Sequence, residues 1–211
     1  MQDRIRAGAE AMGLPLTPLQ GGAFTLLAAE LRAWGKKINL TALLKDEERM
    51  TEELFLDSLS PLLVIKDRGR AGRLLDMGTG AGFPGIPLGI AAPELEITLA
   101  DSVEKKSLFQ RHAIRKLGLT NVRAVTTRFE PDGSRQLPVN HFDWAVAKAV
   151  AEIPVLGGWA LGHLKSGGRL ICMKGPGEAA VSLEGYGPPE ETSYSLPFSG
   201  MKRTLYEYEK C

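Results

Sequence analysis

The stretch RLLDMGTGAGFPG, from Arg73 to Gly85, joins a short apolar run to a glycine-rich turn. An apolar strand that ends in glycines and leads into a helix is the arrangement in which a cofactor binds beside the end of a parallel sheet. Glycines suit this turn because the missing Cβ lets the backbone bend sharply and approach a ligand closely. The spacing Gly80-x-Gly82-x-x-Gly85 also fits the dinucleotide fingerprint, so the glycines alone leave the cofactor open.

Two carboxylates at the ends of apolar runs favour one cofactor. Asp76 stands two residues before Gly78, where it would repel a pyrophosphate but attract the ammonium and sulfonium of S-adenosylmethionine. Asp101 closes the next run, 23 residues after Gly78, where an acid can accept the hydroxyls of an adenosine ribose. The alternative is a turn that only packs a helix against a sheet. The sequence therefore predicts a S-adenosylmethionine site formed by Asp76, Asp101 and the turn residues Gly78, Thr79, Gly80 and Gly82.

Short apolar runs alternate with helical stretches from residue 73 onward. The runs cover 73–77, 95–101, 122–126, 142–147 and 169–174, with helical segments near 85–92, 103–117 and 153–164. This alternation is typical of a parallel sheet that is covered by helices on both faces. Residues 192–198 and 203–209 instead read as an antiparallel hairpin that turns around 198–201. We expect an α/β fold with a Rossmann-like, doubly wound, mostly parallel sheet that ends in this hairpin.

The first part of the chain has a helical pattern. Thr17 and Pro18 read as an N-cap followed by proline at the first helical position. Asp46-Glu47-Glu48 suits the positive end of a second helix, which carries leucines as far as Leu63 inward. The polar stretch 66–72 is interpreted as a linker. We therefore expect a helical extension over residues 1–70 and a methyltransferase domain over 71–211, forming one compact unit.

The composition of the 211 residues excludes several classes of protein. No run of about 18 apolar residues is present, and the N-terminus lacks the apolar core of a secretory signal, so neither a membrane span nor secretion is expected. Cys172 and Cys211 offer no disulfide framework, and the histidines are scattered without ligand spacing. We expect a cytoplasmic monomer that binds no metal and has no membrane partner.

The reacting group is constrained by what the sequence lacks. Methyl transfer from a sulfonium is an in-line displacement that depends on alignment. Enzymes that methylate exocyclic amines carry an Asn/Asp-Pro-Pro-aromatic turn after the fourth strand, whereas residues 145–150 read AVAKAV. Cytosine C5 chemistry needs a thiolate, but Cys172 lies inside an apolar run. A ring nitrogen such as guanine N7 has a free lone pair and needs no general base, which is consistent with this sequence but not demanded by it.

One segment carries the positive charge that a net charge of +1 conceals. Residues 101–135 hold 8 basic and 4 acidic side chains. On a helix over 103–117 the basic residues fall opposite Phe109 and Ala113. Such a face suits an RNA phosphate backbone, although an ordinary solvated helix face has the same pattern. The candidate RNA-binding residues are Lys105, Arg111, Arg115, Lys116 and Arg123.

Lys148 ends the fourth apolar run, on the cofactor side of a doubly wound sheet. There it could close the cofactor pocket, contact a phosphate or base of the substrate, or simply extend its ammonium into solvent from the strand end. The sequence leaves these alternatives open, and it predicts no acid–base catalyst.

An ordered set of short motifs extends from about residue 31 to 175. The set is KINLTA from Lys37, LDSL from Leu56, GTGAGFPGIP from Gly78, Asp101-Ser102 with Lys105-Lys106, LGL from Leu117 with Asn121-Val122, and Leu164-Lys165 with Gly167-Gly168 and Lys174-Gly175. In these residues the chain resembles the bacterial small-subunit rRNA guanine-N7 methyltransferases of the RsmG/GidB family, for which the Gly-Phe-Pro-Gly-Ile-Pro run is specific. The resemblance implies a class I methyltransferase fold, S-adenosylmethionine as cofactor, and methylation of a guanine N7 in 16S rRNA near the decoding region.

The resemblance also implies roles for individual residues. It places cofactor contacts at Gly78 and Phe83 in the turn, at Asp101-Ser102 beside the ribose, and at Phe129-Glu130 beside the adenine. Without the resemblance, Phe129-Glu130 would read as an ordinary loop. The family's arginine after the fourth strand falls on Lys148, which keeps the positive charge but not the bidentate fork.

Other functions stay open on the sequence alone. The substrate could be another RNA or a small molecule, because a net charge of +1 does not demand RNA. A nicotinamide-dependent oxidoreductase and a non-catalytic RNA-binding module are the alternatives from other classes. The sequence also leaves open whether naked 16S rRNA, the small ribosomal subunit or an assembly intermediate is the substrate.

Overall fold

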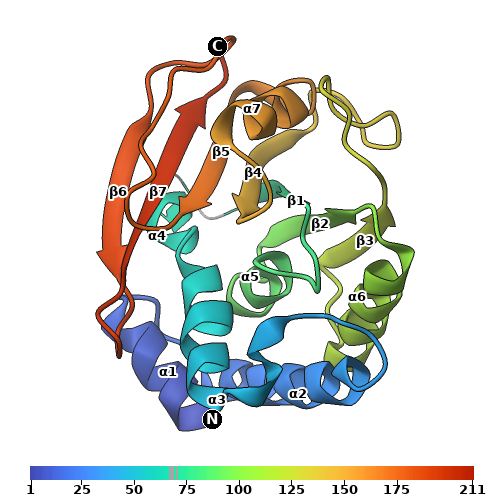
Figure 1. Ribbon diagram of the computed structural model, residues 1–211, viewed down its shortest axis with the longest axis vertical. Helices are drawn as coiled ribbons and strands as arrows, with labels where there is room; N and C mark the ends of the chain where they lie inside the picture. The colour runs from blue at the N-terminus through green and yellow to red at the C-terminus, as the bar shows by residue number, and fades with distance from the viewer. Residues whose placement is uncertain (67–68, 70) are drawn as a thin grey trace.

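The computed structural model describes residues 1–66, 69 and 71–211 of the chain (Figure 1). The helical segments are α1 (Gln2–Ala11), α2 (Pro18–Gly35), η1 (Ala42–Lys45), α3 (Glu47–Arg49), η2 (Met50–Leu56), η3 (Asp57–Leu59), α4 (Leu62–Ile65), α5 (Gly85–Ala91), α6 (Glu104–Leu117) and α7 (Ile153–Leu161). The strands are β1 (Gly72–Met77), β2 (Leu95–Asp101), β3 (Val122–Thr126), β4 (Phe142–Lys148), β5 (Leu164–Lys174), β6 (Glu190–Ser195) and β7 (Lys202–Glu209). Residues 67, 68 and 70 of the expected linker 66–72 lie outside the described residues.

The strands of the described ranges form a seven-stranded sheet in the order β3-β2-β1-β4-β5-β7-β6. The first five of these strands are parallel, and β7 runs antiparallel between β5 and β6. The expected doubly wound sheet with a C-terminal antiparallel hairpin is therefore confirmed. The strand order reverses between β1 and β4, and ligands of such sheets bind beside the carboxyl ends of the strands at that point.

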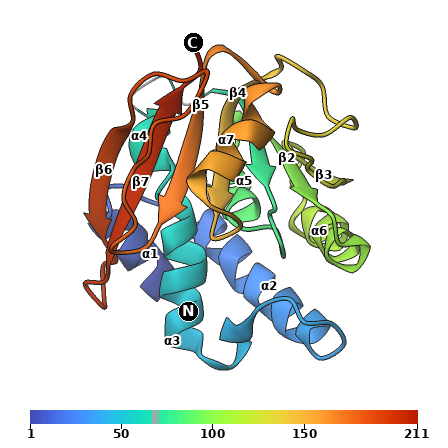
Figure 2. The same ribbon diagram turned by 45° about the horizontal axis from the view of Figure 1, so that its top comes forward.

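The sheet separates two hydrophobic cores, because successive side chains of a strand point to opposite faces. In β1, Leu74 belongs to the core shared with α2, α5 and α6, whereas Leu75 belongs to the core shared with α7. Figures 1 and 2 show α7 beside β4 and β5, and α2 beside α5 and α6. The sheet is thus covered on both faces, as the alternation of apolar runs and helical segments predicted.

The N-terminal helices are joined to the sheet by specific contacts. Thr17 caps α2 as predicted, since its hydroxyl accepts a hydrogen bond from Gln20 N, while the Gln20 side chain accepts one from Thr17 N. The amide of Gln20 also donates to Ile90 O and Ala91 O at the end of α5. Farther along α2, Trp34 meets Phe109 of α6 edge-on, with ring centroids 5.7 Å apart. These contacts make the N-terminal helices part of the layer that covers one face of the sheet.

Three boundaries differ from the sequence prediction. The expected second helix is broken into α3, the π-helical segment η2, the 3-10 turn η3 and α4. The break before α4 falls at Pro61, which has no N–H and whose ring would clash with the carbonyl of an α-helical Asp57. The helix expected over 153–164 ends at Leu161, and β5 begins at Leu164, where it pairs with Phe142. The hairpin turns over 196–201, since Leu196 and Met201 are joined by a backbone hydrogen bond.

The two cysteines have different surroundings. Cys172 is fully buried in β5, and burial raises the pKa of its thiol to about 12, so it packs as a small apolar side chain. Cys211 is exposed. Among residues 1–66, 69 and 71–211, no three His, Cys, Asp or Glu side chains are grouped to hold a metal ion. Over those same ranges, no helix combines the length and the apolar character needed to cross a membrane.

Candidate functional site

The glycine-rich turn lies at the carboxyl end of β1, where the strand order reverses. Gly78, Gly80 and Gly82 all have positive φ angles, of 65°, 60° and 92°, which glycine adopts far more readily than other residues. A Cβ on Gly78 would also lie 2.5 Å from Cγ1 of Val150, so the turn packs directly against the segment that follows β4. The turn therefore requires glycine at Gly78 for two independent reasons, backbone conformation and close packing.

Asp76 fixes the turn from beneath. Its Oδ2 accepts hydrogen bonds from the Thr79 hydroxyl at 2.5 Å and from Gly85 N at 2.7 Å. The side chain is fully buried, and this burial raises the pKa of the carboxyl group to about 7 although both hydrogen bonds act to lower it. Oδ1 has no hydrogen-bond partner among the described residues. Sequence analysis expected Asp76 to face the cofactor, whereas the structure places it under the turn, with Oδ1 free to accept a donor.

Asp101 joins the end of β2 to the turn and to α6. Its Oδ2 accepts a hydrogen bond from Gly80 N, and its Oδ1 accepts one from Val103 N, both at 2.8 Å. Gln110 of α6 donates to Gly80 O at 2.7 Å, so both backbone polar groups of Gly80 are held. Each carboxylate oxygen of Asp101 keeps a second lone pair, so the group can still accept hydroxyl donors from a ligand.

A cavity of about 450 Å³ opens beside these residues, within the range typical of small-molecule sites. Its lining combines backbone from the turn, a carboxylate and two aromatic rings: Gly78, Asp101, Ser102, Val103, Lys106, Thr127, Arg128, Phe129, Ala149, Val150 and Trp159. The rings of Phe129 and Trp159 are stacked, with centroids 5.1 Å apart. A carboxylate for ribose hydroxyls beside an aromatic ring for a base is a donor set that fits an adenosine-containing cofactor. We call this the cofactor cavity.

The predicted cofactor residues divide into those that line this cavity, those that support it, and Glu130 and Lys148, which line other cavities. Gly78, Asp101, Ser102 and Phe129 line it. The supporting residues are Asp76, Thr79, Gly80 and Gly82 in and below the turn, and Phe83, which is largely buried and stacks on Phe55. Glu130 instead lines a neighbouring cavity of about 790 Å³.

A second cavity of about 500 Å³ lies on the other side of Ala149. Its lining comes from the N-terminal segments, the ends of β4 and β5 and the C-terminal hairpin: Leu43, Glu53, Leu54, Asp57, Lys148, Ala149, Met173, Lys174, Gly175, Pro176, Glu178, Tyr194 and Arg203. Ala149 lines both cavities and has a φ of 52°, a left-handed conformation that is uncommon outside glycine. We call this the second cavity.

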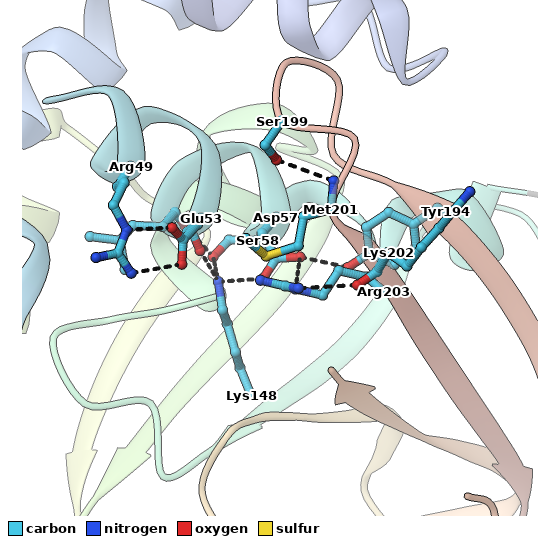
Figure 3. Close-up of polar contacts among 11 residues, drawn as sticks. Arg49, Glu53, Asp57, Ser58, Lys148, Tyr194, Ser199, Met201, Lys202 and Arg203 are labelled. Carbon is cyan, nitrogen blue, oxygen red and sulfur yellow. Dashed lines mark hydrogen bonds and ion pairs between the residues drawn. The ribbon is translucent and has the colours of Figure 1, made fainter. Parts of the chain in front are cut away.

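Lys148 points toward the N-terminal segments (Figure 3). Its Nζ lies 2.7 Å from Glu53 O, 2.9 Å from Asp57 Oδ2 and 3.4 Å from the Ser58 hydroxyl. Its side chain lines the second cavity, and only the next residue, Ala149, reaches the cofactor cavity. The three alternatives left open for Lys148 were closing the cofactor pocket, contacting the substrate and extending into solvent; the structure instead places the ammonium in contacts with the N-terminal segments on the wall of the second cavity.

Asp57 connects that lysine to the C-terminal hairpin (Figure 3). Its Oδ1 accepts a hydrogen bond from the Tyr194 hydroxyl at 2.6 Å and lies 3.8 Å from Nε of Arg203. Burial raises the pKa of the Tyr194 phenol, and the neighbouring Asp57 charge raises it further, so the phenol stays protonated and donates. The Asp57 carboxylate of η3 thus contacts residues of three strands, β4, β6 and β7.

The candidate RNA-binding residues are exposed but do not form one group. Lys105, Arg111, Arg115 and Lys116 lie on α6, where the opposite residues Phe109 and Ala113 are buried as predicted. Arg111 pairs with Glu104 at 2.6 Å. Arg123 lies near the amino end of β3 and donates to the Thr98 hydroxyl, whereas the cofactor cavity lies beside the carboxyl ends of the strands.

Several residues of the two cavities were not found from the sequence. Trp159 lies on α7 and gives no local signal of a ligand contact. Ala149 is distinctive only through its backbone conformation, which the sequence does not reveal. Asp57 is visible in the sequence only as part of the LDSL motif, and its contacts with Tyr194 and Arg203 join segments far apart in the chain.

Comparison with known proteins relates the chain to one protein family. Residues 20–184 match the family model described as rRNA small subunit methyltransferase G (GidB). The chain is 40% identical over 212 residues to the ribosomal RNA small subunit methyltransferase G of Geobacter metallireducens, covering 97% of this chain and 94% of that protein. It is 44% identical over 214 residues to the protein of the same name from Geotalea uraniireducens, covering 96% and 94%. A solved SAM-dependent methyltransferase from Aquifex aeolicus has a similar fold, with a TM-score of 0.55 and 20% identity over 80% of this chain and 95% of that one.

Proposed function

The chain belongs to the rRNA small subunit methyltransferase G family, and from that membership we propose that it transfers a methyl group from S-adenosylmethionine to N7 of a guanine in 16S rRNA. The observation that carries the proposal is the cofactor cavity, which joins Asp101, Phe129 and the glycine-rich turn at the switch point of a doubly wound sheet. When bound there, S-adenosylmethionine supplies an electrophilic methyl group on its sulfonium.

The residues of the cofactor cavity bind and orient. Asp101 accepts the ribose hydroxyls with the lone pairs that Gly80 N and Val103 N leave free. The Phe129 ring offers the adenine an apolar surface, and Trp159 holds that ring in place by stacking. Asp76 holds the turn through Thr79 and Gly85, and its free Oδ1 is available to a donor at the methionine end.

We assign the methyl acceptor to the second cavity, because Ala149 forms a wall of both cavities. Guanine N7 presents a lone pair without losing a proton, so alignment of this atom with the methyl group is the main requirement. The carboxylates of Asp57 and Glu53 are paired with Lys148 and Arg49, which agrees with a site that positions the acceptor and does not remove a proton from it.

The proposed RNA contacts outside the two cavities are phosphate contacts from α6. Lys105, Arg111, Arg115 and Lys116 form an exposed basic face there, and we include Arg123 as a more distant contact beyond that face. A net charge of +1 implies fewer phosphate contacts than a strongly basic RNA-binding protein makes. Recognition then depends largely on RNA shape and on the target base.

The test is methyl incorporation with base mapping. The protein is incubated with methyl-labelled S-adenosylmethionine and either naked 16S rRNA or small ribosomal subunits, and the modified base is identified by chemical cleavage specific for 7-methylguanine. We expect one labelled guanine and no transfer to large-subunit rRNA. Label on another atom or base would overturn the N7 assignment, and the absence of label on either substrate would overturn the activity. Thermal stabilisation by NAD and not by S-adenosylmethionine would favour an oxidoreductase.

A further inference from the structure

The segment from Ala149 to Ala151 separates the two cavities and is held from both ends. Ala149 lines both cavities, and its left-handed φ of 52° is a conformation that persists only where the surroundings enforce it. Val150 packs on Gly78 of the turn. At the far end, Lys174 donates to Ala151 O at 3.2 Å. We call residues 149–151 the partition.

The near end of the partition is fixed by Lys148. A lysine ammonium has three N–H donors. Glu53 O, Asp57 Oδ2 and the Ser58 hydroxyl lie around Nζ at 2.7, 2.9 and 3.4 Å, so these three acceptors occupy the ammonium. The side chain is 17% exposed, and the carboxylate that pairs with it is 6% exposed. The contacts therefore describe a buried tether from the end of β4 to the N-terminal segments, with no donor left for a substrate.

Asp57 supplies the negative charge that balances the Lys148 ammonium in that tether. Glu53 O and the Ser58 hydroxyl are neutral acceptors, so Asp57 is the carboxylate that neutralises Lys148. Its other oxygen is held by the Tyr194 hydroxyl, which fixes the carboxylate against the C-terminal hairpin. A buried ammonium that loses its carboxylate is strongly destabilised and moves toward water.

We propose that Asp57 is a positioning residue for methyl transfer: by holding the Lys148 ammonium it fixes the partition between the cofactor and the methyl acceptor. The inference rests on the proposed function, because a partition matters only if the two cavities hold two reactants. Alignment is the main requirement of this reaction, and a displacement of about 1 Å at a reacting group can lower a rate by about 100-fold. Loss of the tether therefore lowers kcat more than it weakens cofactor binding.

The experiment compares Asp57→Asn, Lys148→Met and the double variant. For each single variant we expect kcat for RNA methylation to fall about 10- to 100-fold, while the calorimetric Kd for S-adenosylmethionine changes less than about threefold. The double variant should be no slower than Lys148→Met, because Asp57 acts through Lys148. Lys148→Arg, which keeps the charge, should retain kcat within about threefold of the unmodified protein.

Hydrogen exchange gives a readout that does not depend on activity. In the unliganded protein, Asp57→Asn and Lys148→Met should each speed exchange of the amides of residues 149–151 by at least about tenfold, as local opening becomes easier. Asp143→Asn is the matched control, because Asp143 pairs with Lys165 at the other end of the same strand, β4. It should change neither kcat nor exchange in the partition.

The outcomes separate the inference from the proposed function. Equal slowing by Asp57→Asn with and without Lys148, or unchanged exchange at residues 149–151, would overturn the positioning role. If the unmodified protein methylates no RNA, the proposed function fails, and the exchange measurement still decides whether the tether exists. If Asp57→Asn does not fold, exchange and kcat in Lys148→Met and Lys148→Arg decide the question.

Discussion

The two cavities of the site are built from contacts of very different range in the chain. On the cofactor side, Asp76 bonds to residues 3 and 9 positions away, and Gly80 bonds to a carboxylate 21 positions away. At the second cavity, which we propose as the acceptor side, Lys148 bonds to Glu53 O, 95 positions earlier in the chain, and Tyr194 bonds to Asp57, 137 positions earlier. The part of the cofactor cavity formed by the turn and Asp101 is made by one strand, its turn and the next strand, and Phe129, Val150 and Trp159 complete the lining from later segments. The second cavity needs the N-terminal segments and the C-terminal hairpin together.

The sequence specifies the two walls in different ways. A wall made by near neighbours can be encoded by a short motif, because strand, turn and helix bring those neighbours together by local geometry. A wall made by segments that are distant in the chain forms only when the whole sheet has brought those segments together. Substitutions on the cofactor side should therefore change cofactor affinity or turn stability, and those on the acceptor side should change the coupling between segments. Variants on each side therefore test whether the two sides are independent.

The largest expected effect is the pH dependence contributed by Asp76. Burial raises the pKa of this carboxyl group from 3.8 to about 7, so between these values the folded protein holds a proton that the unfolded chain has released. Stability therefore falls as pH rises from about 4 to 7. Asp76→Asn removes this loss, which amounts to at most on the order of 4 kcal/mol. Urea unfolding of both proteins at several pH values measures it, with exposed Asp132→Asn as the control. Parallel pH profiles for Asp76→Asn and the unmodified protein would contradict the raised pKa.

The next effect is on cofactor affinity. Asp101→Ala removes the proposed ribose acceptor and leaves Gly80 N and Val103 N without their carboxylate, so we expect the Kd for S-adenosylmethionine to rise about 30- to 100-fold, or about 2–3 kcal/mol. The far-ultraviolet circular dichroism spectrum should stay unchanged. Asp101→Asn, which keeps an acceptor oxygen, should lose less affinity. An unaltered Kd in calorimetry would remove Asp101 from the cofactor site.

A smaller effect is expected on the acceptor side. Tyr194→Phe deletes the hydroxyl that donates to Asp57 at 2.6 Å, and it should lower the free energy of unfolding by about 1–3 kcal/mol because a buried charged acceptor loses a donor. Cofactor affinity should stay within about twofold, since no contact of the cofactor cavity is removed. A large rise in the Kd for S-adenosylmethionine would show that the two sides are not independent. Tyr186→Phe, whose hydroxyl donates to Gly157 O at 3.0 Å outside the lining of both cavities, is the matched control.

The smallest effect concerns the exposed face of α6. Reversal of Arg111 and Arg115 to glutamate should raise KM for RNA several-fold at low salt and leave cofactor affinity unchanged, because phosphate contacts are screened by salt and lie outside both cavities. Methylation kinetics at two salt concentrations measure this, and the difference should shrink at the higher one. Equal KM values would identify the face as an ordinary solvated helix surface.

The same division explains what the sequence could predict. The strands, the cap of α2 at Thr17, the glycine-rich turn and the place of Asp101 all follow from residues that are neighbours in the chain. No helix over residues 2–11 was singled out within the helical extension expected over 1–70, although Ile5 and Ala9 are fully buried, because Ile5 is the one large apolar residue of that ten-residue segment. Pro61 is a local signal for the break before α4, but nothing local indicates the π-helical turns of η2.

The acceptor side could not be predicted, for a physical reason. LDSL, from Leu56 to Leu59, and the lysine after the fourth strand are each visible in the sequence, yet their pairing depends on how the sheet places β4 beside η3. The same holds for Tyr194 and Arg203, which are paired across the hairpin, since nothing in their local sequence indicates which carboxylate they meet. Local propensity carries no information on such pairings, and tertiary packing decides them.

The position of Asp57 has a consequence for biosynthesis. A ribosome makes the chain from its N-terminus, at about 5–20 residues per second, so the 137 positions from Asp57 to Tyr194 correspond to a wait of roughly 7–27 s. The glycine-rich turn and its carboxylates are made during that interval, while Asp57 still lacks the tyrosine of β6 and the arginine of β7. A nascent or truncated chain can thus acquire the cofactor wall without the completed acceptor wall. Completion of this wall therefore waits until β6 and β7 have been made.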